Sequence, residues 1–241
     1  MSQVINGVLK GVTNDELQNG RFVFPEGVTS IGKDAFRDCR GLTEITLPEG
    51  VTSIGHRAFK GCSSLTAITL PESVTSIGFG AFSGCTSLTE ITLPEGVTSI
   101  GDTAFSGCSG LTEITLQEVV TSIGYMAFDG CRNLKKVLSY DSITNIKPNS
   151  FDYCDNLQEI IILETDESHK KSDKIIEMLP VELRTKVRIH SMYDFKEPGA
   201  KTSSSPSSSP SSFFSQGPSE DENGKGKEEI VSASSAFHYQ G

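Results

Sequence analysis

The sequence predicts a repeat solenoid, a stack of short coils joined by a parallel β-ladder, and three observations lead to this fold class. The chain of 241 residues repeats with a period of 23 residues over most of its length, and periods of this size are typical of solenoids. Each unit contains a segment with the alternating apolar and polar residues of a half-buried strand. No single unit can bury its own apolar side chains, so the units must stack to form a core.

Within one unit, the residue types give the order of the elements. Residues 88–93 alternate apolar and polar side chains, which predicts a strand, and residues 94–96 have the Pro-Glu-Gly sequence of a turn. Residues 97–101 predict a second, shorter strand, and residues 103–108 predict a compact corner with a helical turn closed by glycine. Two apolar columns keep the period throughout: Phe36, Phe59, Phe82, Phe105, Phe128 and Phe151, and Cys39, Cys62, Cys85, Cys108, Cys131 and Cys154.

The unit reads L-T-E-I-T-L-P-E-G-V-T-S-I-G-x-x-A-F-x-G-C-x-S. Over residues 22–163 it closely resembles the BspA-like (Treponema pallidum type) leucine-rich repeat. The resemblance implies an α/β leucine-rich-repeat solenoid, a curved parallel β-ladder with short strands and its main sheet on the concave side. It also implies a role in binding proteins or surfaces, without naming one partner.

The ends of the chain depart from the pattern. Residues 1–21 predict a degenerate N-terminal capping coil, in which Ile5 and Val8 precede Val28 and Ile31 by 23 residues. Residues 22–164 contain the repeats. Residues 165–196 predict a helical C-terminal cap, with helices at 172–179 and 180–189 because Pro180 suits a first helical position. Residues 197–241 are rich in Ser, Pro and acidic residues and predict a disordered tail.

The six cysteines lie at one phase of the repeat, so repetition alone produces their even number. Parallel side chains in a column do not face each other as a disulfide requires. Buried free thiols are therefore the favoured interpretation, with some disulfide or a metal site as the alternatives. No CxxC spacing and no recurring histidine supports zinc, and a reduced column suits the cytosol.

Catalysis and several classes of ligand find no support in the sequence. His56, His169, His190 and His238 are scattered, and no nucleophile, phosphate-binding or dinucleotide-binding motif is present. We therefore expect no enzyme activity and no cofactor. The formal net charge of −10 argues against nucleic acid as a partner, and no apolar run is long enough to span a bilayer.

Surface columns remain as candidate binding sites. Side chains between the inward Leu and Ile residues of the strand point outward, and one such column contains Glu90, Glu113 and Lys136. The neighbouring column changes from Thr to Leu138 and Ile161 near the C-terminal end. This arrangement predicts either an ordinary solvated face or a ligand-binding face with an apolar end.

Charge is uneven along the repeats, because no Lys or Arg occurs between Lys60 and Arg132. The middle coils therefore predict an acidic belt, which a protein partner with a basic surface would relieve. Duplication of acidic units is the alternative explanation.

The two residues before each Ala-Phe pair vary while the rest of the unit is copied. Here Arg57, Phe79, Tyr125 and Met126 provide residue types that commonly anchor binding interfaces. Neutral drift on a loop is the alternative.

The tail contains Ser205 and Ser209, each followed by proline, as possible phosphorylation sites, or else it is a simple linker. Its acidic, then small and apolar, C-terminus resembles the translocation signal of type IV secretion effectors. With no recognisable signal peptide, the sequence predicts a monomeric cytosolic protein, secreted as a virulence effector into a host cell. A cytoplasmic scaffold with a regulated tail and a surface adhesin are the alternatives.

Overall fold

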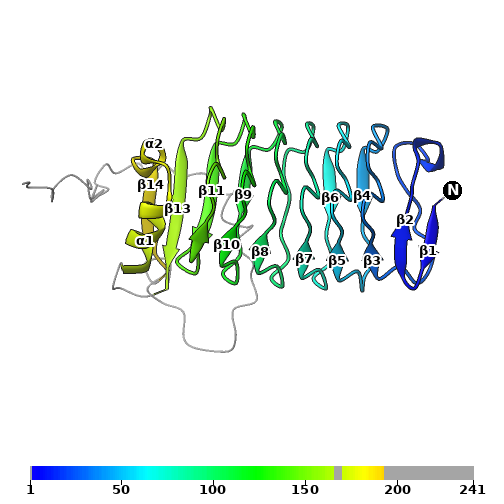
Figure 1. Ribbon diagram of the computed structural model, residues 1–241, viewed down its shortest axis with the longest axis horizontal. Helices are drawn as coiled ribbons and strands as arrows, with labels where there is room; N and C mark the ends of the chain where they lie inside the picture. Colours follow the sequence, from blue (N-terminus) through cyan, green and yellow to red (C-terminus); the bar gives the residue numbers. More distant parts are fainter. Residues whose placement is uncertain (1, 166–169, 193–241) are drawn as a thin grey trace, which may run out of the picture. The chain divides into compact units, whose positions relative to one another are not determined.

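The computed structural model describes residues 2–165 and 170–192. These residues form a parallel β-solenoid of about eight turns, in which the coils lie side by side in chain order (Figure 1). The hairpin of β1 and β2 lies at one end, and α1, α2 and β14 lie at the other. The repeat solenoid predicted from the 23-residue period is confirmed.

The main ladder contains the first strand of every coil that has one. Its strands are β4 (Glu44–Thr46), β6 (Ala67–Thr69), β9 (Glu113–Thr115), β11 (Lys136–Tyr140), β13 (Glu159–Glu164) and β14 (Val187–Ser191). They form a two-stranded sheet of β4 and β6 and a four-stranded sheet in the order β14-β13-β11-β9. Ile45 pairs with Ile68 and Ile114 pairs with Val137, so the pairing register follows the sequence period and each inward apolar column is continuous within its sheet.

The second strand of each coil contributes to a ladder of shorter strands. These are β3 (Ser30–Ile31), β5 (Ser53–Ile54), β7 (Ser76–Ile77), β8 (Ser99–Ile100), β10 (Ser122–Ile123) and β12 (Asn145–Ile146). A glycine follows the Ile of every one of these strands except β12, and it lets the coils approach closely, since a Cβ at Gly55 would lie 2.8 Å from the carbonyl oxygen of Ile31. The strands therefore stop where the chain turns toward the corner.

One predicted strand is absent. Residues 88–93 have no strand assignment, and the ladder of shorter strands is also interrupted between β7 and β8. The corner still connects these coils, because the Phe82 amide donates to the carbonyl oxygen of Ala104 at 2.8 Å. The coils thus remain stacked although both β-ladders are interrupted here.

The corner of each coil is a succession of turns. The Ala104 amide donates to Gly101 within the coil at 3.2 Å, and the Phe105 amide donates to Ala127 of the next coil at 2.8 Å. Gly107 adopts a φ of 74°, a conformation that glycine adopts without steric cost. The predicted closing glycine is confirmed, while the helical turn is a run of hydrogen-bonded turns.

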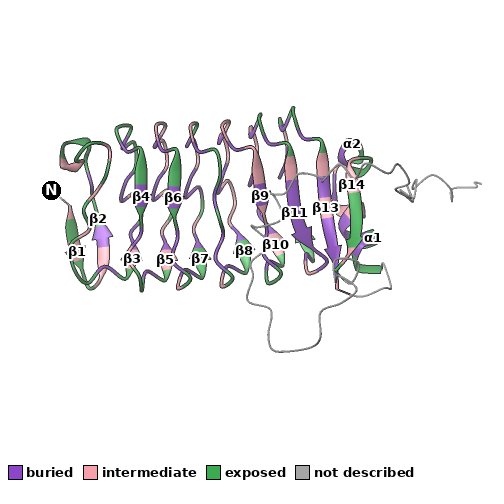
Figure 2. Ribbon diagram, turned by 180° about the vertical axis from the view of Figure 1, so that it is seen from behind, coloured by how far each residue is buried: buried purple, intermediate pink, exposed green. Residues whose placement is uncertain are grey.

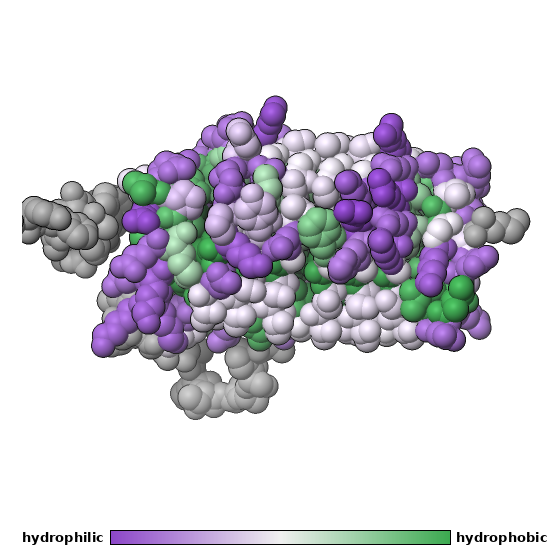
Figure 3. Space-filling view, in the orientation of Figure 1, coloured by the Kyte–Doolittle hydropathy of each residue, from purple (hydrophilic) through white to green (hydrophobic). Residues whose placement is uncertain are grey.

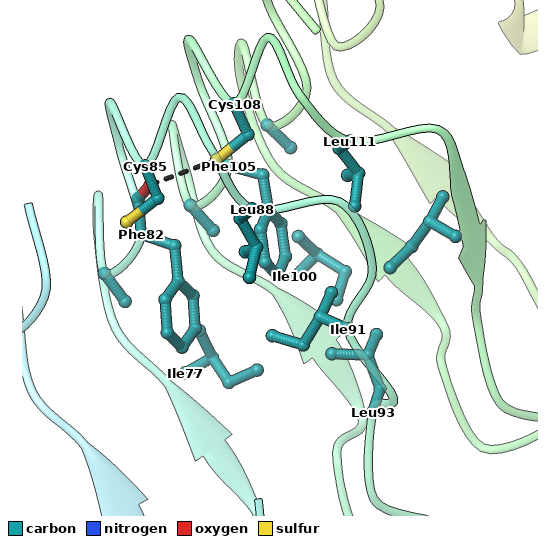
Figure 4. Packing of buried hydrophobic residues seen from close by; sticks show 14 of the residues in the cluster. Ile77, Phe82, Cys85, Leu88, Ile91, Leu93, Ile100, Phe105, Cys108 and Leu111 are labelled. Carbon is teal, nitrogen blue, oxygen red and sulfur yellow. Dashed lines mark hydrogen bonds between the residues drawn. The ribbon is translucent and has the colours of Figure 1, made fainter. Parts of the chain in front are cut away.

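The core consists of the repeated apolar columns. The Phe82 and Phe105 rings are fully buried and stack with centroids 5.3 Å apart, and the Cys108 thiol donates to the carbonyl oxygen of Phe82 at 3.1 Å (Figure 4). Stacking of coils therefore buries each interior ring of the column between two copies of itself, and the thiol beside it also satisfies a carbonyl group.

The N-terminal end is a hairpin of β1 (Gln3–Ile5) and β2 (Val8–Lys10), followed by the 3-10 helix η1 (Asn14–Glu16). Its β2 strand pairs with β3 so that Leu9, not Val8, aligns with Ile31. The predicted register was wrong by one residue. Because side chains alternate in a strand, the slip places Leu9 in the core, where it is fully buried, and leaves Val8 half-buried.

The C-terminal end contains α1 (Lys170–Met178) and α2 (Val181–Arg184). The buried side chains Ile175, Leu179 and Leu183 join the core, so they cover the open end of the solenoid as expected. The helix predicted through residue 189 was wrong, because β14 instead pairs in parallel with β13. The side chains of β14 are exposed or half-buried, whereas most side chains of β11 and β13 are buried (Figure 2).

Candidate functional site

The variable pair of residues before each Ala-Phe, or before Ser150-Phe151 in the last coil, lies on the outside of the corner. We call these pairs the corner column: residues 33–34, 56–57, 79–80, 102–103, 125–126 and 148–149. The second member has a positive φ in every pair: Asp34, Arg57, Gly80, Thr103, Met126 and Asn149. Backbone hydrogen bonds tie the column together, as the Arg57 amide donates to Phe79 at 2.8 Å and the Thr103 amide donates to Tyr125 at 2.8 Å. The backbone is fixed, so the side chains are presented in a regular row.

Phe79 and Tyr125 are large aromatic residues at the surface of this row. Their exposed fractions are 39% and 42%. The Arg57 guanidinium lies 5.4 Å from the centre of the Phe79 ring, within cation–π range, and the His56 ring lies 6.3 Å from it. The structure therefore brings together two of the predicted residues, Arg57 and Phe79, across adjacent coils.

Tyr125 and Met126 lie two coils further along. The Tyr125 amide donates to the Asp102 carboxylate at 2.8 Å, and that carboxylate forms an ion pair with Lys147 at 3.4 Å. Met126 is half-buried. Asp102 is thus occupied by its neighbours, which leaves the Tyr125 ring as the most exposed apolar group of this part of the column.

The other predicted residues lie on the outer face of the main ladder, a separate surface. Lys136 on β11 stands between Glu113 and Glu159 in the register and pairs with Glu159 at 3.6 Å, while Glu90 lies in the unassigned segment and is exposed. Leu138 is buried at 4% exposure and Ile161 is half-buried. A buried leucine offers no surface to a partner, which corrects the predicted apolar end of this face.

The carboxylates of the predicted acidic belt are spread over three surfaces. Glu90 and Glu113 lie on the outer face of the ladder, Asp102 and Asp129 lie at the corner, and a third set occupies the turns between the strands: Glu72, Glu95 and Glu118. Burial, with Glu118 and Glu95 nearby, raises the pKa of Tyr140. The middle coils are acidic, but their charges do not form one continuous patch.

The cysteine column has no accessible chemistry. All six residues are buried free thiols, and burial raises the pKa of Cys39 to about 11 and that of Cys154 to about 12. Burial raises the pKa of the four interior thiols further. Thiolates are the nucleophilic form, so these side chains are inert packing groups at neutral pH.

Neither a metal site nor a deep cleft stands out in the part of the chain that the structure describes. Within residues 2–165 and 170–192, no group of three or more His, Cys, Asp or Glu side chains could hold a metal ion. The same residues contain no helix long and apolar enough to cross a bilayer. A shallow pocket of about 270 Å³ lies between the last corner and the cap, lined by residues that include Lys147, Pro148, Met178 and Arg184.

Sequence reasoning missed that His56 lies beside Phe79 and that Lys33 and Lys60 share two adjacent basic corners with His56. They belong to the corners that follow β3 and β5, as do Arg37 and Arg57. The signal that could have found them is phase, because residues 33 and 56, and residues 37 and 60, each differ by one period. Ser205 and Ser209 lie outside the described residues.

Comparison with known proteins places these observations in a family. The BspA type leucine rich repeat region matches residues 14–109 and 81–173, with six copies of the repeat. No curated protein matches the chain.

Solved structures provide the second comparison. A leucine rich cell surface protein from Faecalibacterium prausnitzii is 27% identical with a TM-score of 0.53, over 65% of this chain and 50% of that protein. A Treponema pallidum leucine rich repeat protein is 26% identical with a TM-score of 0.53, over 65% of this chain and 87% of that protein. The pneumococcal vaccine antigen PcpA, at 20% identity and a TM-score of 0.50 over 78% of this chain and 46% of that protein, shares the fold alone. The alignment thus covers only half of the Faecalibacterium protein.

Proposed function

The chain belongs to the BspA-type leucine-rich repeat proteins, and we propose that it is a non-enzymatic module that binds a protein partner through the corner column. The observation that carries this proposal is the exposure of Phe79 and Tyr125 on a fixed row of turns. Exposed aromatic residues on a rigid backbone lose little conformational entropy on binding and are frequent interface anchors.

The chemistry around the anchors supports a protein as the ligand. Arg57 and Met126 flank the aromatic residues, and these residue types are enriched at interfaces. The acidic residues of the middle coils, including Asp129 and Glu113, favour basic groups on the part of the partner that reaches them. The partner therefore contacts several coils at once, and a monomer presents the whole column.

The double variant Phe79→Ala and Tyr125→Ala tests the proposal. We expect it to reduce capture of the native partner by at least about tenfold, since each lost anchor costs about 1–2 kcal/mol. Proximity labelling in the native cell identifies the partner, and a binding titration of the purified pair gives the affinity. The matched control is Val119→Ala, which removes an exposed apolar side chain outside the column. An unchanged affinity at an unchanged melting temperature contradicts the proposal.

We propose further that the protein acts as a bacterial effector delivered into the cytosol of a host cell. A set of buried, unreactive thiols is compatible with a reducing compartment, and the composition of residues 218–241 resembles that of type IV translocation signals. A reporter fusion that lacks residues 218–241 tests this role. Delivery that persists without those residues, or no delivery by the intact fusion, contradicts it.

A surface adhesin is the second candidate, because the Faecalibacterium protein of similar structure is described as a cell surface protein. Protease treatment of intact source cells separates the two. Cleavage of the solenoid from outside supports the adhesin, and protection of the solenoid supports an intracellular effector or scaffold.

A further inference from the structure

Basic residues gather on one side of two adjacent coils. The corners at residues 32–41 and 55–64 contain Lys33, Arg37, Arg40, Arg57 and Lys60 against Asp34 and Asp38, which leaves three net positive charges. The two corners are joined directly, because the Asp38 amide donates to the carbonyl oxygen of Lys60 at 2.7 Å. Figure 3 shows a group of strongly hydrophilic side chains over the coils of β3 to β6, beside a more apolar area.

Only part of this positive charge is neutralised within the protein. Arg37 pairs with Asp34 at 3.6 Å and with Asp38 at 3.4 Å. Lys33, Arg57 and Lys60 form no ion pair with any other residue in the ranges 2–165 and 170–192. Their cations are available to a ligand, in contrast to Lys147 and Lys136, which are paired with carboxylates.

One of the unpaired cations, Arg57, lies over the exposed aromatic ring of the following coil. Stacking over Phe79 uses the flat face of the Arg57 guanidinium, and its N–H groups remain able to donate to a carboxylate in a bidentate manner. Adjacent coils are about 5 Å apart, so Lys33, Arg57 and Phe79 span about 10 Å. An extended peptide covers that distance with about three residues. We name Lys33, Arg37, His56, Arg57, Lys60 and Phe79 the basic–aromatic patch.

We propose that the basic–aromatic patch binds an acidic peptide segment that also carries an aromatic side chain. The carboxylates of the segment pair with Arg57, Lys60 and Lys33, and its ring packs against Phe79. This inference rests on the proposed function, of which it specifies the partner chemistry. No Lys or Arg occurs between Lys60 and Arg132, so the middle coils offer an acidic ligand no competing cations, and a control variant covers the basic residues beyond them.

The test is a titration of the purified full-length chain with a fluorescent random copolymer of glutamate and tyrosine, followed by anisotropy. We expect saturable binding that weakens as salt is added, and weaker binding of polyglutamate, which lacks the ring. The double variant Arg57→Glu and Lys60→Glu raises the Kd by at least about tenfold. Arg57→Lys keeps the charge but loses the stacked, bidentate guanidinium, so it weakens binding by less than the double charge reversal does.

The matched control is the double variant Arg132→Glu and Lys135→Glu, which makes the same change of charge at two exposed residues several coils away. It leaves the Kd for the copolymer within about twofold. The inference is overturned if the native chain shows no saturable binding, if both double variants lose affinity equally, or if heparin binds the patch as tightly as the copolymer. The last result identifies a general polyanion site.

The outcome is separable from that of the proposed function. If the copolymer fails to bind but Phe79→Ala with Tyr125→Ala still reduces capture of the native partner, the corner column binds a protein of another chemistry. If the copolymer binds but the aromatic variant captures the partner normally, the patch exists and the role of the anchors is wrong.

Discussion

The buried phenylalanine column and the corner column lie a few residues apart on every coil, yet one is copied without change and the other varies. Phe105 stacks between Phe82 and Phe128 at 5.3 Å and 5.5 Å, and a different side chain would leave a void or a clash at both interfaces. The adjacent pair of residues lies at the surface, and backbone hydrogen bonds between coils hold its main chain in place. The residue type must therefore stay the same where a side chain packs against its own copies. The surface residues beside it can change from coil to coil and can form a binding site.

The largest expected contrast is between Phe105→Ala and Phe79→Ala. Removal of the fully buried ring loses its transfer free energy and leaves a cavity, which costs about 3–5 kcal/mol. Removal of the exposed ring is expected to cost less than about 1 kcal/mol. Urea denaturation of both variants measures the difference. Similar losses in both would show that the corner column contributes to the core.

The reactivity of the buried thiols provides a second test of the contrast between the buried and the exposed columns. The native protein should react slowly with a thiol reagent at pH 8, with Cys39 first, because its pKa of about 11 is the lowest of the six. All six thiols should react in urea, and Cys39→Ala should remove the first-reacting group. Rapid labelling of an interior cysteine in the native state would mean that the column opens.

The same thiols make stability depend on pH. The unfolded chain loses thiol protons above a pH of about 8.5 while the native chain keeps them, so unfolding becomes more favourable as pH rises. The loss reaches about 1.4 kcal/mol per pH unit for each protected thiol. Denaturation midpoints between pH 8 and 10 measure it, and a midpoint that rises over this range contradicts the assignment.

A smaller effect tests the backbone of the corner column. Gly80 has a φ of 59° and room for a side chain, since its nearest non-adjacent neighbour would lie 3.4 Å from a new Cβ. Gly80→Thr should therefore cost about 1–2 kcal/mol through backbone conformation alone. The reverse type of change, Thr103→Asn, should stabilise by a few tenths of a kcal/mol at a φ of 53°. Ser83→Thr, near Gly80 but without a positive φ, is the control, and equal losses for it and Gly80→Thr would exclude a conformational cause.

Much of the fold could be predicted because the same residue types recur at the same position of successive repeats. The positions of Phe, Cys, Leu and Ile at one phase predicted the columns that are buried in the structure, since only stacking can bury them. The ends were harder, because each lacks a neighbour on one side. Leu9 replaced Val8 in the core, and the segment of β14 paired with β13 instead of continuing as a helix.

The candidate site was predicted in part. Phase and variability pointed to Arg57, Phe79, Tyr125 and Met126, and the structure places all four in one row. The contact between Arg57 and Phe79 and the grouping of Lys33 and Lys60 required three dimensions, because residues one period apart become neighbours only when coils stack. Leu138 was predicted to be accessible and is buried.

The hexapeptide Leu-Thr-Glu-Ile-Thr-Leu occurs at residues 42–47, 88–93 and 111–116. The first and third copies contain β4 and β9, whereas the copy at residues 88–93 has no strand assignment. The sequence by itself determined the period, the buried columns and the stacked architecture, because those follow from which side chains must leave water. Only the tertiary structure decided which copies complete a ladder, which register the first strand takes and which charges share a face, because those depend on the neighbouring coil.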